Sequence, residues 1–174
     1  FNRRFLVYFA VDTHEVWMTT KLAGDKTYFL PFNQGSNGAG NVGGAGNPER
    51  DDDYITAYLW QNVLQKDALL DIIQRFMNLE VKIEKNSSGK QVEKKTLIFP
   101  RYHQLDVVKK LVEDTQQNGS GNHYLIQHSA GSGKSNSIAW LAYHLQRIHN
   151  DQNQPLFNSV IIVTDRTVLD RQLQ

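Results

Sequence analysis

The sequence predicts an α/β fold, in which an antiparallel β-meander and a helical segment precede a parallel sheet built around a glycine-rich loop. Residues 5–32 are rich in aromatic and β-branched side chains, which favours short strands. Residues 54–79 place apolar side chains at helical spacing. Over residues 123–165 the order is strand, glycine loop, helix and strand. That order is typical of a βαβ unit and implies parallel strands with a right-handed crossover.

Composition excludes several kinds of site. The 174 residues contain no cysteine, which excludes disulfides and thiolate metal sites and fits a cytosolic protein. The formal net charge is +1, so nucleic-acid binding would have to come from local patches. No run of about 18 apolar residues exists, and we expect no membrane span. The chain starts in a strand-like run without an initiator methionine and ends in a helix-like run, so we expect an internal piece of a larger protein.

The first half of the chain divides by pattern. The meander comprises three strands, at 5–12, 15–22 and 26–32, separated by turn residues. Residues 33–50 hold six Gly and four Asn, which predicts a flexible linker or surface loop. Neither a lysine nor a helix signal follows these glycines, so we reject a phosphate-binding role for them. The three aspartates at 51–53 could hold a cation or could cap the next helix.

Two helices and a hairpin are expected next. Lys66 and Asp67 divide the helical run, with Asp67 as the N-cap, and Trp60 and Phe76 are expected in the core. Residues 80–98 alternate charged and apolar side chains, which favours a hairpin. Its lysines could contact DNA phosphates, although the interleaved glutamates favour a solvated surface. The expected domains are 1–32, 33–53, 54–98 and 99–174.

The stretch "QHSAGSGKSNS" at 127–137 contains Gly131-Ser132-Gly133-Lys134-Ser135 between a strand-like run and an amphipathic helix. This pattern is typical of a loop whose backbone N–H groups bind nucleotide phosphates. Lys134 would reach the β- and γ-phosphates, and the Ser135 hydroxyl would bind Mg²⁺. His128 stands where the pattern has its first glycine, and an unliganded glycine turn is the alternative. The candidate nucleotide-binding residues here are Ser129, Ala130, Gly131, Ser132, Gly133, Lys134 and Ser135, of which Lys134 and Ser135 are also the candidate catalytic residues.

Two flanking stretches narrow the class of nucleotide-binding protein that the loop indicates. "IFPRYHQLDVV" at 98–108 resembles the adenine-reading element of superfamily 2 helicases, with Gln104 on the base and Arg101 and Tyr102 flanking it. A polar residue in the first turn of a helix is the alternative for Gln104. Thr164 and Arg166 follow the second strand-like run and resemble a helicase element that contacts the nucleic-acid backbone. The alternative is that Asp165 caps the next helix and Arg166 pairs with Asp170.

Together, "FPRYHQLDVV", "LIQHSAGSGKSNSIAWLA" and "IIVTDRTVLDRQLQ" resemble the first RecA-like motor domain of the restriction (R) subunit of type I restriction-modification enzymes. "FAVDTHEVWMTTKL", "FLPFNQG" and "GAGNP" resemble the stretch before that motor. The variant His128-Ser129-Ala130 is similar to the loop of that family. The resemblance therefore covers nearly the whole chain.

The resemblance implies an ATP- and Mg²⁺-dependent hydrolase of the bacterial or archaeal cytoplasm. Such a subunit translocates double-stranded DNA and cleaves it together with methylation and specificity subunits. Residues 1–32 would end a nuclease domain whose catalytic residues have no match here. The second Mg²⁺-binding element, an acidic box, and the second motor domain are also missing, so this piece should not translocate or cleave alone. The alternatives are another superfamily 2 helicase or translocase, a nucleotide-binding enzyme without a DNA substrate, and a non-enzymatic docking module.

Overall fold

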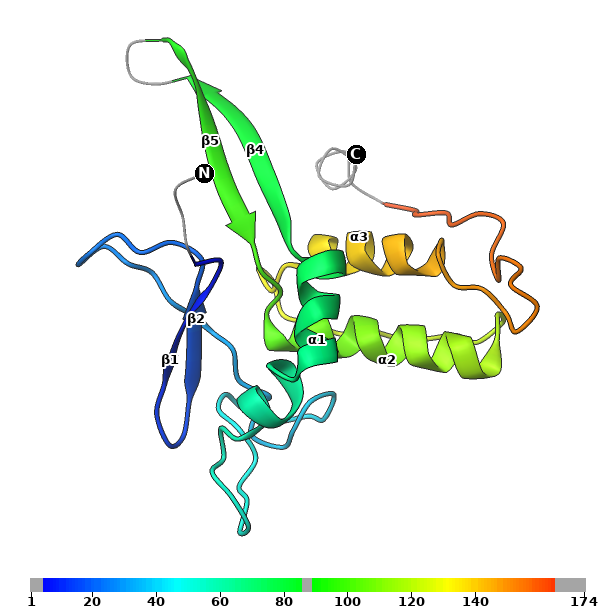
Figure 1. Ribbon diagram of the computed structural model, residues 1–174, viewed down its shortest axis with the longest axis horizontal. Helices are drawn as coiled ribbons and strands as arrows, with labels where there is room; N and C mark the ends of the chain where they lie inside the picture. The colour runs from blue at the N-terminus through cyan, green and yellow to red at the C-terminus, as the bar shows by residue number, and fades with distance from the viewer. Residues whose placement is uncertain (1–4, 86–88, 165–174) are drawn as a thin grey trace. The chain divides into compact units, whose positions relative to one another are not determined.

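The computed structural model describes residues 5–85 and 89–164 (Figure 1). The chain divides into two compact units, the first ending at His103 and the second starting at Gln104. All strand pairing within the described residues is antiparallel: a three-stranded sheet and a two-stranded ribbon, both in the first unit. No described helix is long and apolar enough to cross a membrane.

The three-stranded sheet confirms the predicted meander. Its strands are β1 (Tyr8–Val11), β2 (Val16–Thr19) and β3 (Leu30–Pro31), in the order β1-β2-β3. The Asp12 carboxylate closes the turn between β1 and β2. It accepts hydrogen bonds from the backbone N–H groups of His14 at 2.7 Å and Glu15 at 2.8 Å. These bonds hold the pKa of Asp12 below its ordinary value. The third strand is shorter than the predicted 26–32, because the backbone N–H groups of residues 26 and 27 close a turn onto residues 23 and 24.

An aromatic cluster forms the core of the first unit. Phe32 is fully buried, and its ring lies 5.4 Å from that of Phe9 and 5.7 Å from that of Tyr102, edge to face in both cases. Phe99 contacts the rings of Phe9 and Phe32 at 5.8 and 6.1 Å. The buried Tyr58 hydroxyl donates to the Phe32 carbonyl at 2.8 Å. Burial, followed by the proximity of Tyr102, raises the pKa of Tyr58. The meander and the chain leading into α2 therefore share one core.

The glycine-rich stretch at 33–50 is a hydrogen-bonded surface loop. Backbone N–H groups of Gly35 and Ser36 donate to the carbonyls of Gly46 and Gly44 at 2.7 and 3.0 Å. Asn47 closes the base, where its carbonyl accepts from the N–H of residue 34 at 2.8 Å and its amide donates to the carbonyl of residue 14 at 2.8 Å. Hydrogen bonds hold this loop, since it has little apolar area to bury.

The helical segment comprises η1 (Leu59–Val63), α1 (Lys66–Asp71) and η2 (Ile72–Phe76). The helical run is divided as predicted, but the division lies at residues 64 and 65, before Lys66, and not at Lys66 and Asp67. The predicted N-cap is wrong, because Gln65 occupies that position without a side-chain capping bond and Asp67 lies inside the first turn. Phe76 is buried as expected, but Trp60 is 42% exposed. Its ring instead lies against the exposed Tyr54 ring, with centroids 6.4 Å apart.

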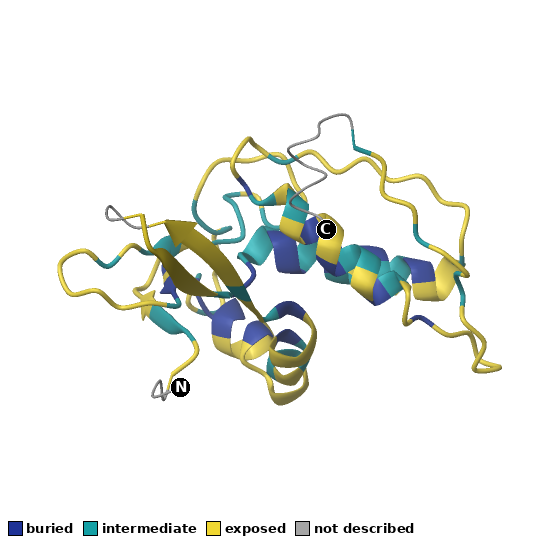
Figure 2. Ribbon diagram, turned by 90° about the horizontal axis from the view of Figure 1, so that it is seen from above, coloured by how far each residue is buried: buried dark blue, intermediate teal, exposed yellow. Residues whose placement is uncertain are grey.

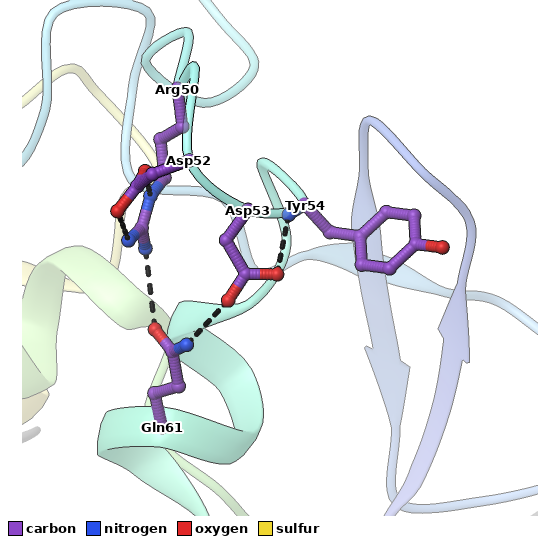
Figure 3. A network of polar contacts seen from close by, with 5 residues as sticks. All are labelled: Arg50, Asp52, Asp53, Tyr54 and Gln61. Carbon is purple, nitrogen blue, oxygen red and sulfur yellow. Dashed lines mark hydrogen bonds and ion pairs between the residues drawn. The ribbon is translucent and has the colours of Figure 1, made fainter.

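The acidic run at 51–53 forms local hydrogen bonds (Figure 3). Asp53 accepts from the backbone N–H of Tyr54 at 2.7 Å and from the side-chain amide of Gln61 at 2.5 Å. Asp52 pairs with the Arg50 guanidinium at 3.2 Å. The predicted cap is wrong, because η1 starts later, after Tyr58, and has no side-chain capping bond. Among the described residues, no group of three or more His, Asp or Glu side chains could hold a metal ion.

The predicted hairpin is confirmed as β4 (Asn78–Lys85) paired with β5 (Gln91–Ile98). The ribbon is exposed over most of its length (Figure 2). Three of its lysines pair with glutamates of the same ribbon, with N–O distances of 3.0 to 3.3 Å: Lys82 with Glu80, Lys94 with Glu84, and Lys95 with Glu93. Because these lysines are paired with glutamates, the ribbon fits the solvated surface that the sequence favours better than a surface that binds DNA phosphates.

The second unit contains most of α2 (Tyr102–Asn118) and all of α3 (Lys134–Leu145). The parallel sheet that the sequence predicted is absent from the described residues. Residues 123–127 and 159–164, expected as its strands, form no ladder with any described segment. A strand requires a paired neighbour for its backbone groups, and these segments have none among the described residues. Their apolar side chains are accordingly exposed, with Leu125 at 94% and Val163 at 89%.

Candidate nucleotide-binding site

The loop at 128–133 turns sharply into α3 through two glycines. Gly131 has φ +72° and Gly133, the N-cap of α3, has φ +82° and ψ 34°. Both values lie in the left-handed region, which glycine adopts at little cost. The other residues of the loop have no positive φ. The two glycines of the predicted motif are therefore the two positions where the backbone requires them.

Lys134 begins α3 and its side chain bends back over the loop. Its Nζ donates to the carbonyl of His128 at 3.0 Å and to the carbonyl of Ser129 at 2.9 Å. An ammonium group is thus held at the loop, next to the N-terminus of a 12-residue helix. Both features favour negative charge at this place.

The loop can accept the His128 side chain at the position where the motif has its first glycine. Its φ is not positive, so the backbone does not require glycine there. The half-buried imidazole lines a cavity of about 260 Å³ between α2 and α3, together with apolar residues such as Val108 and Leu111. Burial and then the charge of Lys134 lower the pKa of His128, and Asp106 opposes the shift. A neutral imidazole at neutral pH follows from these two causes.

Apolar residues of both helices line the same cavity, and Ser137 is among its lining residues. Ser137 is 9% exposed, and its buried Oγ has no hydrogen-bond partner within the described part of the chain. Ile138 and Leu141 of α3 line this cavity, while Trp140 and His144 are buried residues of the same helix. The apolar stripe of α3 therefore faces open volume instead of a sheet.

Gln104 is the flanking residue that the structure brings to the loop. It lies in the first turn of α2, is 3% exposed, and its Nε2 donates to the carbonyl of Gly133 at 2.8 Å. A Cβ placed on Gly133 would lie 2.4 Å from that nitrogen. Glycine is therefore required at 133 for space as well as for its backbone angle.

The remaining candidates are placed as follows. Ser129 and Ala130 are exposed, Ser132 is 6% exposed, and Ser135 is half-buried in the first turn of α3. Arg101 precedes α2 in the first unit, and its predicted contact with the base stays a prediction. Thr164 is half-buried outside any helix or strand, and Arg166 lies outside the described residues.

Sequence reasoning missed two features of this site. It treated His128 only as a departure from the motif, whereas the side chain lines the cavity beside Lys134. It also missed Ser137, whose place on α3 is visible in the sequence but whose burial is not. Helical spacing from Lys134 would have found Ser137, because residues three apart share a face.

The residues present fit a nucleoside triphosphate and Mg²⁺. Two glycines without Cβ atoms, a helix N-terminus and one ammonium group gather within a single turn. Lys134 and the loop backbone would hold the phosphates, and the Ser135 hydroxyl would bind Mg²⁺.

Similarity to known proteins agrees with this chemistry. Residues 103–174 match the SWI2/SNF2 ATPase family, which supports an ATPase of the helicase type. An endonuclease subunit named for the type I restriction enzyme MjaVIIIP of Methanocaldococcus jannaschii is 30% identical over 137 residues, 72% of this chain. The endonuclease subunit of the type I restriction enzyme HindI of Haemophilus influenzae is 30% identical over 122 residues, 70% of this chain. The chain belongs to the endonuclease subunits of type I restriction enzymes.

The expected resemblance is thereby confirmed. The matched stretches span 12% and 11% of the two subunits' own lengths. No solved structure matches the chain.

Proposed function

We propose that this chain supplies the ATP-binding loop of a type I restriction subunit that couples ATP hydrolysis to translocation and cleavage of double-stranded DNA. The observation that carries the proposal is the loop at 128–134. There, two glycines have positive φ, and the Lys134 ammonium group is held on the carbonyls of His128 and Ser129. The match of residues 103–174 to an ATPase family supports it.

The chain's own residues bind and orient the nucleotide. Lys134 exchanges the carbonyls of His128 and Ser129 for phosphate oxygens, which are stronger hydrogen-bond acceptors for a cation. The α3 N-terminus adds the positive end of its dipole. The Ser135 hydroxyl would hold Mg²⁺, and the ion would supply positive charge to neutralise the phosphates.

Contacts with other molecules are proposed from the sequence pattern. Thr164 and Arg166 would contact the DNA backbone, and Arg101 would lie beside the base. Residues 1–32 would end the nuclease domain, 33–53 would follow as a loop, 54–98 would form the helical pair and hairpin, and 99–174 would start the first RecA-like domain. Methylation and specificity subunits would be the partners, in the cytoplasm of a bacterium or archaeon. The names of the relatives support this proposal, since type I restriction enzymes are assemblies that contain an endonuclease subunit.

The decisive experiment measures ATP hydrolysis, with and without double-stranded DNA, by the full-length protein assembled with its partner subunits. Lys134→Ala should abolish hydrolysis, translocation and cleavage, while sequence-specific DNA binding survives. Lys26→Ala is the matched control, because Lys26 is an exposed lysine outside the loop. Full hydrolysis by the Lys134 variant would refute the proposal.

A second function has one observation in its favour. The SWI2/SNF2 match would also suit a DNA translocase that remodels or repairs without cutting. DNA-dependent hydrolysis that is lost with Lys134, but without cleavage of DNA in the complete assembly, would favour this alternative. Hydrolysis that ignores DNA would favour an enzyme without a DNA substrate.

A further inference from the structure

Trp60 lies in a helical segment and was expected in the core, yet it is 42% exposed. Tyr54, whose ring centroid lies 6.4 Å from that of Trp60, is 61% exposed. Leu64 follows Trp60 by four residues at the end of η1 and is 37% exposed. Residues four apart in a helix are neighbours on its surface. These three side chains, here called the aromatic patch, are therefore open to solvent.

An exposed tryptophan and tyrosine in contact are typical of a surface that binds another protein. Both residue types are enriched at interfaces, and tryptophan and tyrosine are among the residues whose truncation weakens binding most. The planes of the two rings are 67° apart, so an edge of one ring meets the other. This contact holds both side chains before a partner arrives, which lowers the entropy that binding must remove.

The chain leading into the aromatic patch carries an excess of negative charge. Residues 49–53 contain four carboxylates and one arginine. The Arg50 guanidinium donates to both carboxylate oxygens of Asp52 at 3.2 Å, so these two charges compensate each other. The other three carboxylates form no ion pair with any described residue: Glu49, Asp51 and Asp53. The run therefore presents uncompensated negative charge.

Hydrogen bonds fix this acidic run to the helix that carries Trp60 (Figure 3). The Asp53 carboxylate accepts from the side-chain amide of Gln61 at 2.5 Å, and the Gln61 carbonyl accepts from Arg50 at 3.3 Å. Gln61 directly follows Trp60 in η1, and Tyr54 directly follows Asp53. Figure 3 shows the Tyr54 ring pointing away from this network. The aromatic and acidic side chains thus come from adjoining residues of one hydrogen-bonded segment.

We propose that the aromatic patch is a docking site for a basic, arginine-bearing segment of another protein chain. A guanidinium group binds the face of an indole or phenol ring and pairs with carboxylates beside it. The uncompensated carboxylates repel phosphates, so this surface is unsuited to DNA. The inference goes beyond the proposed function, because it involves no residue of the nucleotide-binding loop.

The test places a photo-crosslinker next to Trp60 in the full-length protein assembled with its partner subunits and DNA. Leu64→p-benzoylphenylalanine leaves the tryptophan and the acidic run intact. Irradiation and mass spectrometry then identify the crosslinked peptide, and mixing isotopically labelled with unlabelled protein distinguishes a crosslink within one chain from one between two copies. We expect an arginine-containing peptide of a different protein. A crosslink only within the chain, to a second copy or to DNA, or no crosslink at all, would overturn the inference.

Two variants in the crosslinker background test the chemistry of docking. Loss of a tryptophan anchor typically weakens an interface about 30-fold, so Trp60→Ala should lower the crosslink yield by up to that factor. Asp51→Lys reverses an exposed charge without changing an aromatic ring and should lower the yield as well. Asp25→Lys is the matched control, because Asp25 is an exposed aspartate outside the acidic run, and it should leave the yield unchanged. Equal yields with Asp51→Lys and Asp25→Lys would contradict the proposed charge complementarity, even if Trp60→Ala disturbs the fold.

Discussion

Replacing the two loop glycines by alanine should weaken nucleotide binding to different degrees, because only one of them touches Gln104. Both have φ near +75°, at +72° for Gly131 and +82° for Gly133. An alanine in this region costs about 1–2 kcal/mol. At Gly131 no heavy atom lies within 4 Å of the added Cβ, so this strain is the whole cost.

Gly133 carries an additional cost. Its Cβ would lie 2.4 Å from the Gln104 amide nitrogen, so the glutamine must move and its 2.8 Å hydrogen bond is lost. That bond contributes about 0.5–1.5 kcal/mol, which brings the total to about 1.5–3.5 kcal/mol. If the strain is relieved by leaving the binding-competent conformation, affinity for Mg-ATP should fall about 5- to 30-fold in Gly131→Ala and about 10- to 400-fold in Gly133→Ala.

The assay is calorimetric titration of Mg-ATP into the full-length variants. The double variant Gly133→Ala/Gln104→Ala should bind better than the sum of its single effects predicts, by about 0.5–1.5 kcal/mol, because the displaced group is gone. Binding that is weaker in Gly131→Ala than in Gly133→Ala, or full additivity in the double variant, would refute the reasoning.

Two further predictions concern the fold. Phe32→Ala should lower the opening free energy of the β1 and β2 amides, measured by hydrogen exchange, by about 3–5 kcal/mol, because Phe32 is fully buried. Tyr28→Ala is the control and should change this free energy little, because Tyr28 is 75% exposed. Equal effects of the two substitutions would contradict the assigned core. Hydrogen bonds from Tyr124, Asn118 and Asn122 lower the pKa of Asp114 from 3.8, so its stabilising contribution is present above that value and is lost as pH falls through the lowered folded-state pKa. The thermal midpoint of Asp114→Asn should therefore decrease less steeply on acidification than that of wild type; parallel curves would contradict this role.

Local pattern was enough to predict several elements. The alternation of charged and apolar side chains over residues 80–98 predicted the β4–β5 ribbon, because a hairpin pairs residues that are close in sequence. The amphipathic helix predicted after the glycine loop is α3, and the two glycines of the motif are the residues of the loop that have positive φ. Each of these features depends on interactions within a few residues of the chain.

Features that depend on residues distant along the chain could not be predicted from the local sequence pattern. Residues 123–127 have the composition of a buried strand, yet a strand forms only where a neighbour pairs with it, and no described segment does. Trp60 and Phe76 were equivalent on sequence, and packing alone buried one and exposed the other.

The sequence by itself determined the chemistry of the loop, since its glycines, Lys134 and Ser135 are adjacent along the chain. Only the tertiary structure decided that Gln104, 29 residues before Gly133, would contact its carbonyl, and that His128 would turn into a cavity between two helices. The physical reason is that motif spacing encodes local backbone geometry, whereas the burial of a polar side chain depends on which other elements fold against it.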